Sequence, residues 1–272
     1  MQKEIDEVIV TKEYYDSNPE KEWNRLEGFR FEFEITKFYL KKYLKGKTVL
    51  DIGGGPGRYS IYLSQLGYDV TLVDLSDGNI QFLRNKMKEL NIDNIKSYQC
   101  DARDLSKLNL GKFDNILLMG PLYHLFKESD REKCVLEAKK LLKEDGILFA
   151  SFISVSGGLN YYLENEPENI INEPEKDLFD CMAKDENWSG NAFTKSTFIN
   201  NCLVVDFFKK LGFEKLALFG QEGVTGTRLN YIQKCNEEVR QFYLELSLKL
   251  CENPQYFYYA NHIMYIGKII NN

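Results

Sequence analysis

A glycine-rich segment near the start of the chain could bring backbone amides close to a bound ligand. Residues 51–57 read DIGGGPG and follow an apolar run. Glycines permit a tight turn and a close approach of the backbone, and the N-terminus of a following helix attracts negative charge. The dinucleotide-binding pattern G-x-G-x-x-G fits in no frame, because Arg58 or Ser60 stands where its third glycine is needed. That glycine lets helix and strand pack closely, so its absence disfavours a nicotinamide-dependent oxidoreductase.

Polar residues also follow three later strand-like runs, of which the one at 95–100 is the weakest. Asp74 and Asp101 each stand at the end of one run, where a carboxylate could accept hydrogen bonds from a ligand. The alternative for an isolated Asp is a turn or a helix cap. Tyr123 and His124 follow the third run. Histidine has a pKa suited to a general base near neutrality, and a capping or core role is the alternative for His124.

These residues meet only if strands and helices alternate along the chain. Helices are predicted at 59–66, 79–90 and 129–143. Seven strands are predicted, at 48–52, 70–74, 95–100, 113–119, 146–153, 214–219 and 260–266. The alternation favours βαβ units, and thus an α/β fold with a doubly wound, mostly parallel seven-stranded sheet. Ligands of such sheets lie beyond the carboxyl ends of the strands.

Two segments depart from this alternation. Residues 1–45 are rich in aromatic side chains and are predicted to form a helical N-terminal cover. Residues 46–272 are then the main domain. Within that domain, residues 155–197 lack clear periodicity, which is typical of an inserted lid. After the lid, a helix is predicted at 197–211 and a long amphipathic segment at 228–251.

In order and position these features resemble those of the class I S-adenosylmethionine-dependent methyltransferases, in their small-molecule branch. The first motif of that family is acidic-x-Gly-x-Gly-x-Gly, matched here by Asp51, Gly53, Gly55 and Gly57. The resemblance covers residues 45–155 well and the remainder by topology alone. It implies a Rossmann-like methyltransferase fold in which Asp74 binds both ribose hydroxyls and Asp101 lies beside the adenine.

The resemblance also implies a set of site residues. The cofactor-binding set is Asp51, Gly53, Gly55, Gly57, Arg58, Asp74, Leu75, Asp101, Ala102, Met119 and Gly120. Tyr123 and His124 are the candidate catalytic residues. The candidate acceptor-binding residues are Tyr14, Tyr15, Arg25, Tyr161, Tyr162 and Trp188. Some N-methylating members carry an Asn/Asp-Pro-Pro-Tyr motif in the loop after strand four, and Met119–Leu122 lacks it, so that chemistry is not indicated.

The implied activity is the in-line transfer of a methyl group from S-adenosylmethionine to a small-molecule acceptor, with S-adenosylhomocysteine as product. Alignment of the methyl group with the attacking atom makes the largest contribution to such a reaction. Two alternatives share the donor site: an RNA or protein methyltransferase, and a non-catalytic S-adenosylmethionine-binding module. A net charge of -6 disfavours a nucleic-acid partner, because phosphate binding relies on Lys and Arg. The acidic run of residues 164–175 likewise favours a cationic or neutral acceptor, unless it is only a solvated face.

The cysteines and histidines do not form a metal-binding pattern. The six cysteines are scattered without a CxxC pair, so no metal site is predicted. His262 falls in an expected strand, where a structural role is the more common one. Residues 1–15 lack the apolar region of a signal peptide, and no apolar run approaches the ~20 residues that span a bilayer. A cytoplasmic protein without a membrane partner is therefore expected, and its oligomeric state is not indicated.

Overall fold

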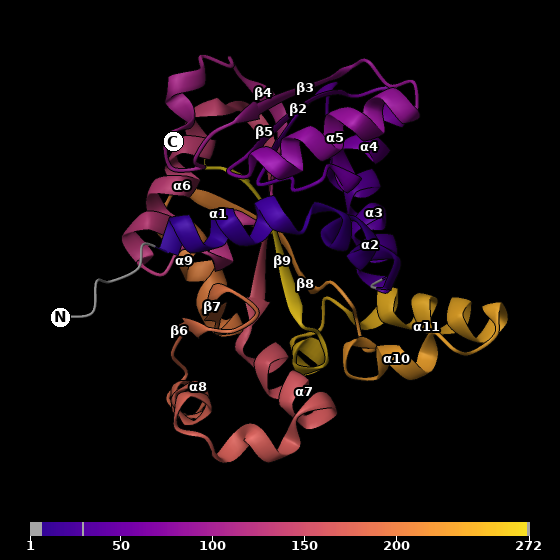
Figure 1. Cartoon of the computed structure of the whole chain (residues 1–272), viewed down its shortest axis with the longest axis vertical. Coiled ribbons are helices and arrows are strands. Elements are labelled where there is room, and N and C mark those ends of the chain that lie inside the picture. The colour runs from indigo at the N-terminus through magenta and orange to yellow at the C-terminus, as the bar shows by residue number, and fades with distance from the viewer. Residues whose placement is uncertain (1–6, 29, 271–272) are drawn as a thin grey trace.

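The central element of the computed structural model is one open β-sheet (Figure 1). The structure describes residues 7–28 and 30–270. The described residues form nine strands: β1 (Thr48–Ile52), β2 (Asp69–Asp74), β3 (Ile95–Gln99), β4 (Phe113–Leu118), β5 (Leu142–Ser154), β6 (Trp188–Asn191), β7 (Lys195–Ile199), β8 (Phe213–Gly220) and β9 (His262–Ile269). Strands β3-β2-β1-β4-β5 are parallel neighbours, and β9 is antiparallel to both β5 and β8. This arrangement confirms the predicted Rossmann-like, mostly parallel sheet.

The predicted number of seven strands is wrong, because a hairpin adds two more. β6 and β7 pair antiparallel, and β7 runs parallel to the last two residues of β5. The hairpin strands are short and include Gly190 and Asn191, residue types that are depleted in strands. The helix predicted to begin at Thr197 begins at Val204 instead, because Thr197 belongs to β7.

Helices cover both faces of the sheet. They are α1 (Glu7–Ser17), α2 (Pro19–Gly28), α3 (Arg30–Tyr43), α4 (Arg58–Gln65), α5 (Asp77–Glu89), α6 (Glu128–Leu141), α7 (Val155–Asn165), α8 (Glu173–Ala183), α9 (Val204–Lys210), α10 (Leu229–Ile232) and α11 (Glu237–Leu250). Short 3-10 helices lie at Leu105–Leu108, Pro121–Tyr123, Pro167–Ile171, Asn201–Leu203, Gly226–Arg228 and Pro254–Tyr259. The segment predicted at 228–251 is thus divided between α10 and α11.

Alternate residues of the central strands β1, β2, β4 and β5 belong to two separate hydrophobic clusters. In β4, Ile116 and Leu118 pack with residues of α6 and α9, whereas Leu117 packs with residues of α3, α4 and α5. Successive side chains of a strand point to opposite faces of a sheet. Both faces are therefore buried, as expected for parallel strands with helical crossovers.

The N-terminal helices lie against the main body of the protein. Figure 1 shows α1 crossing in front of the sheet. Asp16 Oδ1 accepts hydrogen bonds from Ser76 Oγ at 2.7 Å and from the Gly78 amide at 3.1 Å, which ties the end of α1 to the start of α5. Residues 1–6 and 29 of the predicted cover lie outside the described residues.

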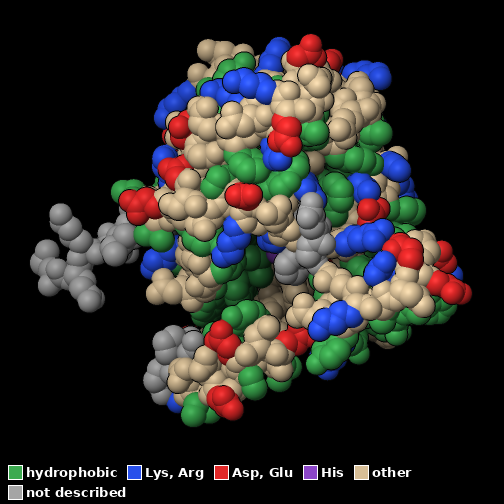
Figure 2. Space-filling model, turned by 45° about the vertical axis from the view of Figure 1, so that its right-hand side comes forward, with side chains coloured by type: hydrophobic (Ala, Val, Ile, Leu, Met, Phe, Trp, Pro, Cys, Tyr) green, Lys and Arg blue, Asp and Glu red, His purple; other side chains and the backbone are tan. Residues whose placement is uncertain are grey.

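The segment predicted as a lid is mostly helical. It contains α7, α8 and the β6–β7 hairpin, and its helices project from the body of the molecule (Figure 1). A small hydrophobic cluster of Ile153, Val155, Leu178 and Phe198 joins this segment to the ends of β5 and β7. In Figure 2 the surface is hollowed between this projection and the body, and hydrophobic side chains line the hollow. No helix among the described residues is both long and apolar enough to cross a membrane.

Candidate active site

The loop from β1 to α4 brings four glycines to the carboxyl end of the sheet. Three of them have positive φ, at 67° for Gly53, 57° for Gly55 and 86° for Gly57. A Cβ atom at Gly53 would lie 2.5 Å from Pro121 Cδ, and one at Gly57 would lie 2.5 Å from a methyl carbon of Leu83. At Gly55 the nearest atom to such a Cβ would be 3.9 Å away. Gly55 lines a pocket and has open space beside it, so a ligand can approach its backbone closely.

Asp74, at the end of β2, faces the same pocket with a firmly held carboxylate. Its Oδ2 accepts the Gly55 amide at 2.8 Å, and its Oδ1 accepts the Ser76 amide at 2.8 Å and Asn79 Nδ2 at 3.3 Å. Burial raises the pKa of Asp74, although the two amide bonds act in the opposite direction. The residue therefore both stabilises the β2–α5 turn and lines the pocket.

Asp51 lies beneath the glycine loop and is almost completely buried. Ser60 Oγ donates to its Oδ2 at 2.7 Å. Burial raises the pKa of Asp51 to about 7, with the Ser60 bond opposing the rise and the charge of Asp74 adding to it. Asp51 thus changes charge near neutral pH, and a cationic group in the pocket would favour its ionised form.

Asp101, after β3, is held by the neighbouring arginine. Arg103 Nη2 donates to Asp101 Oδ2 at 2.7 Å, and the Arg103 amide donates to Oδ1 at 2.8 Å. Burial opposes ionisation, but the Arg103 bonds outweigh it and lower the pKa of Asp101. Arg103 also donates to Asp130 at 3.0 Å. Asp101 therefore presents an ionised carboxylate in a fixed orientation.

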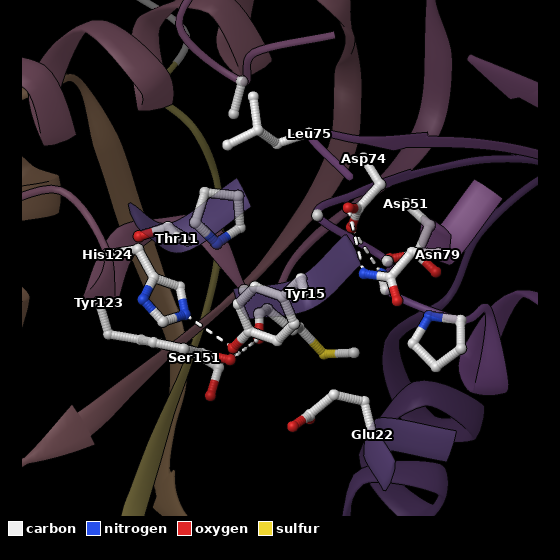
Figure 3. Close-up of a pocket in the computed structure, with 18 of the residues that line it drawn as sticks. Thr11, Tyr15, Glu22, Asp51, Asp74, Leu75, Asn79, Tyr123, His124 and Ser151 are labelled. Atoms are coloured by element: carbon white, nitrogen blue, oxygen red, sulfur yellow. Dashed lines mark hydrogen bonds between the residues drawn. The ribbon is translucent and has the colours of Figure 1, made fainter. Parts of the chain in front are cut away.

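His124 lies on another side of the pocket and bonds through both ring nitrogens. Its Nε2 lies 2.9 Å from Tyr15 Oη, and its Nδ1 lies 3.0 Å from the carbonyl oxygen of Lys195. A carbonyl can only accept, so Nδ1 carries the proton and Nε2 accepts from Tyr15. Burial lowers the pKa of His124 to about 4. Figure 3 shows this bond on the side of the pocket opposite Asp51 and Asp74.

Charged residues from α2 and α3 form a further part of the lining. Arg25 Nη1 donates to Glu32 Oε2 at 2.8 Å, and Arg25 Nε lies 3.3 Å from Glu22 Oε2. Burial disfavours the charge of Glu32, but Arg25 outweighs this effect and lowers the pKa of the carboxyl. Arg25 was among the predicted residues, whereas Glu22 and Glu32 were not.

His262 joins these side chains from β9, although the sequence favoured a structural role for it. Its Nδ1 lies 2.5 Å from Glu222 Oε1. Ligand atoms of Glu32, Glu222 and His262 all lie within 4.8 Å of one another. Three side chains that can bind a metal thus come together where the sequence indicated no such group. Their present partners are other protein groups, since Arg25 holds Glu32 and backbone amides hold Glu222.

Residues 49–146 match the protein family described as a methyltransferase domain. These residues form a methyltransferase domain built on a mostly parallel sheet. The matched residues run from β1 to the first part of β5, and they include the loops that present Gly55, Asp74 and Asp101. The family match and the pocket therefore coincide in the same part of the fold.

Curated relatives of the methyltransferase domain include enzymes named for small-molecule substrates. A glycine/sarcosine N-methyltransferase of Parasynechococcus marenigrum (strain WH8102) is 33% identical over 131 residues, which is 46% of each chain. A ubiquinone biosynthesis O-methyltransferase of Coxiella burnetii is 35% identical over 113 residues, covering 41% of this chain and 45% of the relative. The chain spans about half the length of these first relatives.

Similar solved structures extend the likeness to the whole chain. The magnesium protoporphyrin IX methyltransferase ChlM from Synechocystis PCC 6803, with bound SAH, has a TM-score of 0.59 and 14% identity, covering 98% of this chain and 100% of that one. The PH0226 protein from Pyrococcus horikoshii OT3 has a TM-score of 0.56 and 19% identity, covering 89% and 91%. At these identities the similarity establishes the fold of the methyltransferase domain.

Most of the residues predicted to bind the cofactor line the same pocket, together with several predicted catalytic and acceptor-binding residues. The predicted residues found there are Tyr15, Arg25, Asp51, Gly53, Gly55, Arg58, Asp74, Leu75, Asp101, Ala102, Met119, Gly120, Tyr123 and His124. Gly57 is not among the lining residues, because it packs against Leu83. Additional lining residues that the sequence did not indicate include Val8, Thr11, Glu22, Glu32, Asn79, Ser151, Gln221 and His262.

Four residues predicted to bind the acceptor lie outside the lining. Tyr14 packs by its ring against Tyr15 and Phe193. Tyr161 is half exposed and donates to Glu166, whereas Tyr162 and Trp188 pack against the hydrophobic cluster of the α7–α8 segment. The lining includes none of the described residues between 155 and 197. The sequence did not show that the described residues of 155–197 would pack on a separate hydrophobic cluster and contribute no side chain to the pocket lining.

Proposed function

We propose that the protein transfers a methyl group from S-adenosylmethionine to a small-molecule acceptor and releases S-adenosylhomocysteine. The observation that carries this proposal is the convergence of Gly55, Asp74 and Asp101 from three neighbouring strands on one pocket. An accessible glycine backbone, a carboxylate for two hydroxyls and a second carboxylate for a base are the groups that an adenosine ligand requires. Two similar ChlM structures hold SAH and SAM, which fits this assignment.

The charge distribution of the pocket suits a cationic donor. In this proposal the sulfonium and amino groups of the donor lie near Asp51, where they favour the ionised carboxylate. The loop of Met119 and Gly120 then borders the methyl group. The protein contributes mainly by aligning the donor with the acceptor and by excluding water.

A small acceptor is favoured over RNA or protein because helices cover the pocket. Val8, Thr11 and Tyr15 of α1, with Glu22 and Arg25 of α2, form part of its lining. Those helices would have to move before a macromolecule could reach the donor. Conversion of isotopically labelled donor to product with extracted metabolites, compared with RNA and protein fractions, separates the two classes of acceptor. A non-catalytic module would convert none of them.

The proposed donor site is tested by ligand binding in the wild type and in Asp74→Asn. A ligand at about 100 times its dissociation constant stabilises a fold by about 2.7 kcal/mol. S-adenosylmethionine and S-adenosylhomocysteine should therefore raise the melting temperature, whereas nicotinamide cofactors should not. Asp74→Asn should weaken calorimetrically measured binding by about 1.5–3 kcal/mol per charge-assisted bond lost.

Asp104→Asn is the matched control for that variant. Asp104 pairs with Lys107 and Lys133 and does not line the pocket, so the affinity should stay unchanged. A melting curve that does not respond to saturating donor contradicts the proposed function.

We further propose that the α7–α8 segment, by which we mean residues 155–197 with α7, α8 and the β6–β7 hairpin, acts on the acceptor indirectly. The carbonyl of Lys195 bonds to His124, and Tyr123 packs against the hydrophobic cluster of the segment. Tyr123 and His124 line the pocket, so movement of the segment would change the pocket wall. A cationic or neutral acceptor suits the carboxylates of the pocket better than a phosphate-rich one.

A further inference from the structure

A buried histidine–carboxylate pair forms one end of the pocket. His262 Nδ1 lies 2.5 Å from Glu222 Oε1. The second oxygen, Oε2, accepts the backbone amides of Asn261 and His262 at 3.0 Å each. Glu222 is completely buried, and three donors fix its carboxylate in place. A carboxylate held in this way accepts the Nδ1 proton and fixes the orientation and tautomer of the ring.

This tautomer leaves the lone pair of His262 on Nε2. Among the described residues Nε2 has no hydrogen-bond partner, and the side chain is 17% exposed and lines the pocket. His124 differs, because both of its nitrogens are engaged by Tyr15 and Lys195. Of the two histidines in the chain, His262 is therefore the one with a nitrogen available to a bound molecule.

The groups around His262 give this end of the pocket an excess of negative charge. Glu222 follows β8, Glu32 comes from α3 and Arg25 from α2, and all three act on the imidazole. Burial lowers the pKa of His262, but the two carboxylates outweigh burial and the charge of Arg25, so the pKa is raised. Glu22 adds a third carboxylate beside the Arg25 guanidinium. Such a surface favours a cationic group on the acceptor.

We propose that His262 and Glu222 form a dyad that takes a proton from an amine acceptor, which enters as an ammonium and is methylated on nitrogen. This inference rests on the proposed methyl transfer. Glu222 is the positioning residue, and His262 is the group that contacts the acceptor. The carboxylates of Glu22 and Glu32 attract the ammonium.

The proposed reaction balances in atoms and charge. His262 Nε2 takes one proton from the ammonium, which leaves a lone pair on the acceptor nitrogen. That nitrogen attacks the methyl carbon, a C–N bond forms, and the C–S bond breaks with its electron pair passing to sulfur. The products are the thioether S-adenosylhomocysteine and a protonated, methylated amine. The imidazolium then releases its proton to solvent.

The rate test uses His262→Asn, whose amide can still donate to Glu222 but cannot take a proton. Glycine, sarcosine and simple primary and secondary amines serve as probes, with phenols for comparison. Loss of a general base lowers rates by about 10²–10⁴-fold. We expect a loss of this size in kcat, with the KM of the amine and the affinity for S-adenosylhomocysteine within about threefold (about 0.7 kcal/mol). The fall in rate at low pH should also disappear in His262→Asn. In a second variant, His262→Gly, added imidazole should partly restore the rate of methyl transfer.

An unchanged rate in His262→Asn overturns the proposal. So does a parallel loss of rate and product affinity without imidazole rescue, which marks a structural residue. If S-adenosylhomocysteine binds but no amine is methylated, or only phenols are, the amine assignment fails while the donor site stands. If S-adenosylhomocysteine does not bind, the proposed function itself fails.

Nuclear magnetic resonance tests the dyad without any acceptor. In His124→Asn, the only remaining imidazole is that of His262. Its ring nitrogens should show a neutral form protonated on Nδ1 and a titration midpoint above the ordinary 6.5. A neutral ring protonated on Nε2, or a midpoint below 6.5, overturns the dyad. With S-adenosylhomocysteine bound, glycine or sarcosine should shift the Nε2 resonance, whereas a phenol should not.

Discussion

Asp51 and Asp74 line the same pocket but differ in the number of donors that hold them. Asp74 accepts two backbone amides and the Asn79 side chain, whereas Ser60 alone donates to Asp51 among the described residues. Fewer donors compensate less for burial, so the ionised form of Asp51 is the less stabilised one. Asp51 therefore responds to the charge of a ligand at neutral pH, and Asp74 provides fixed acceptors.

Asp51 should make the ligand-free protein less stable as pH rises. Its folded-state pKa of about 7 lies above its ordinary 3.8, so the folded state holds the proton more tightly than the unfolded state between these values. The free energy of unfolding contributed by Asp51 therefore falls as pH rises from 3.8 to about 7 and is constant above that range. Asp51→Asn removes this contribution.

Urea unfolding of the wild type and Asp51→Asn across that range provides the measurement. The other titrating groups are common to both proteins, so the difference isolates Asp51. The variant should become progressively more stable relative to the wild type up to pH 7. A pH-independent difference would show that Asp51 keeps its ordinary pKa in the fold.

At the scale of elements, α1 is attached to the pocket by one of its two adjacent tyrosines. Tyr15 bonds to His124, which bonds in turn to β7 through Lys195, so three distant segments are linked. Tyr14 instead packs on Phe193 and receives a hydrogen bond from Lys21 at 3.4 Å. Tyr15 thus links α1 to the pocket wall through His124, whereas its neighbour Tyr14 contacts Phe193 and Lys21.

Tyr15→Phe should loosen α1, with Tyr14→Phe as the matched control. Loss of the hydroxyl leaves His124 Nε2 buried without its partner, which costs about 1–3 kcal/mol. We expect a lower melting temperature and faster hydrogen exchange in residues 7–17, measured by mass spectrometry. Tyr14→Phe should change neither by a comparable amount. Equal exchange in the two variants would contradict an anchoring role for the Tyr15–His124 bond.

The sequence could predict β1, β2, β4 and β5 and their loops because each contains a buried apolar run, whereas the mostly exposed β3 was indicated only by the alternation of strands and helices. It could not predict the β6–β7 hairpin, whose pairing depends on the end of β5 rather than on strand propensity. The Glu222–His262 pair depends likewise on the antiparallel register of β8 and β9. Glu32 had a signal, since it shares a helix face with Ile35 and Tyr39 at i+3 and i+7. A charge on an apolar face indicates a buried polar contact.

At the scale of the whole molecule, the donor site and the α7–α8 projection are largely separate. The proposed donor residues come from β1–β4 and the loops that follow, whereas the described lining contains no residue between 155 and 197. Contacts between the two parts include those of Tyr123 with the hydrophobic cluster and of His124 with the Lys195 carbonyl. The projection should therefore influence the acceptor more than the donor.

Replacement of residues 160–186 by a short Gly/Ser linker should separate these two roles. This deletion leaves the β6–β7 hairpin and the Lys195–His124 bond in place. Calorimetry should give a dissociation constant for S-adenosylhomocysteine within about tenfold of the wild-type value, a difference of ~1.4 kcal/mol in binding free energy. Turnover of the native acceptor should be lost. Retained turnover of the same acceptor would show that the projection does not govern specificity.

The position of β9 determines when the protein can fold during its synthesis. β9 is the last described strand in sequence order, yet it lies between β5 and β8, and Ile263–Ile266 are completely buried. Until the ribosome has released this strand, β5 and β8 have unpaired edges, and such edges promote aggregation. α1 and α2, which are translated earlier than β9, must likewise wait for this strand to complete the pocket wall. A growing chain would therefore expose the edges of β5 and β8 until β9 has been translated.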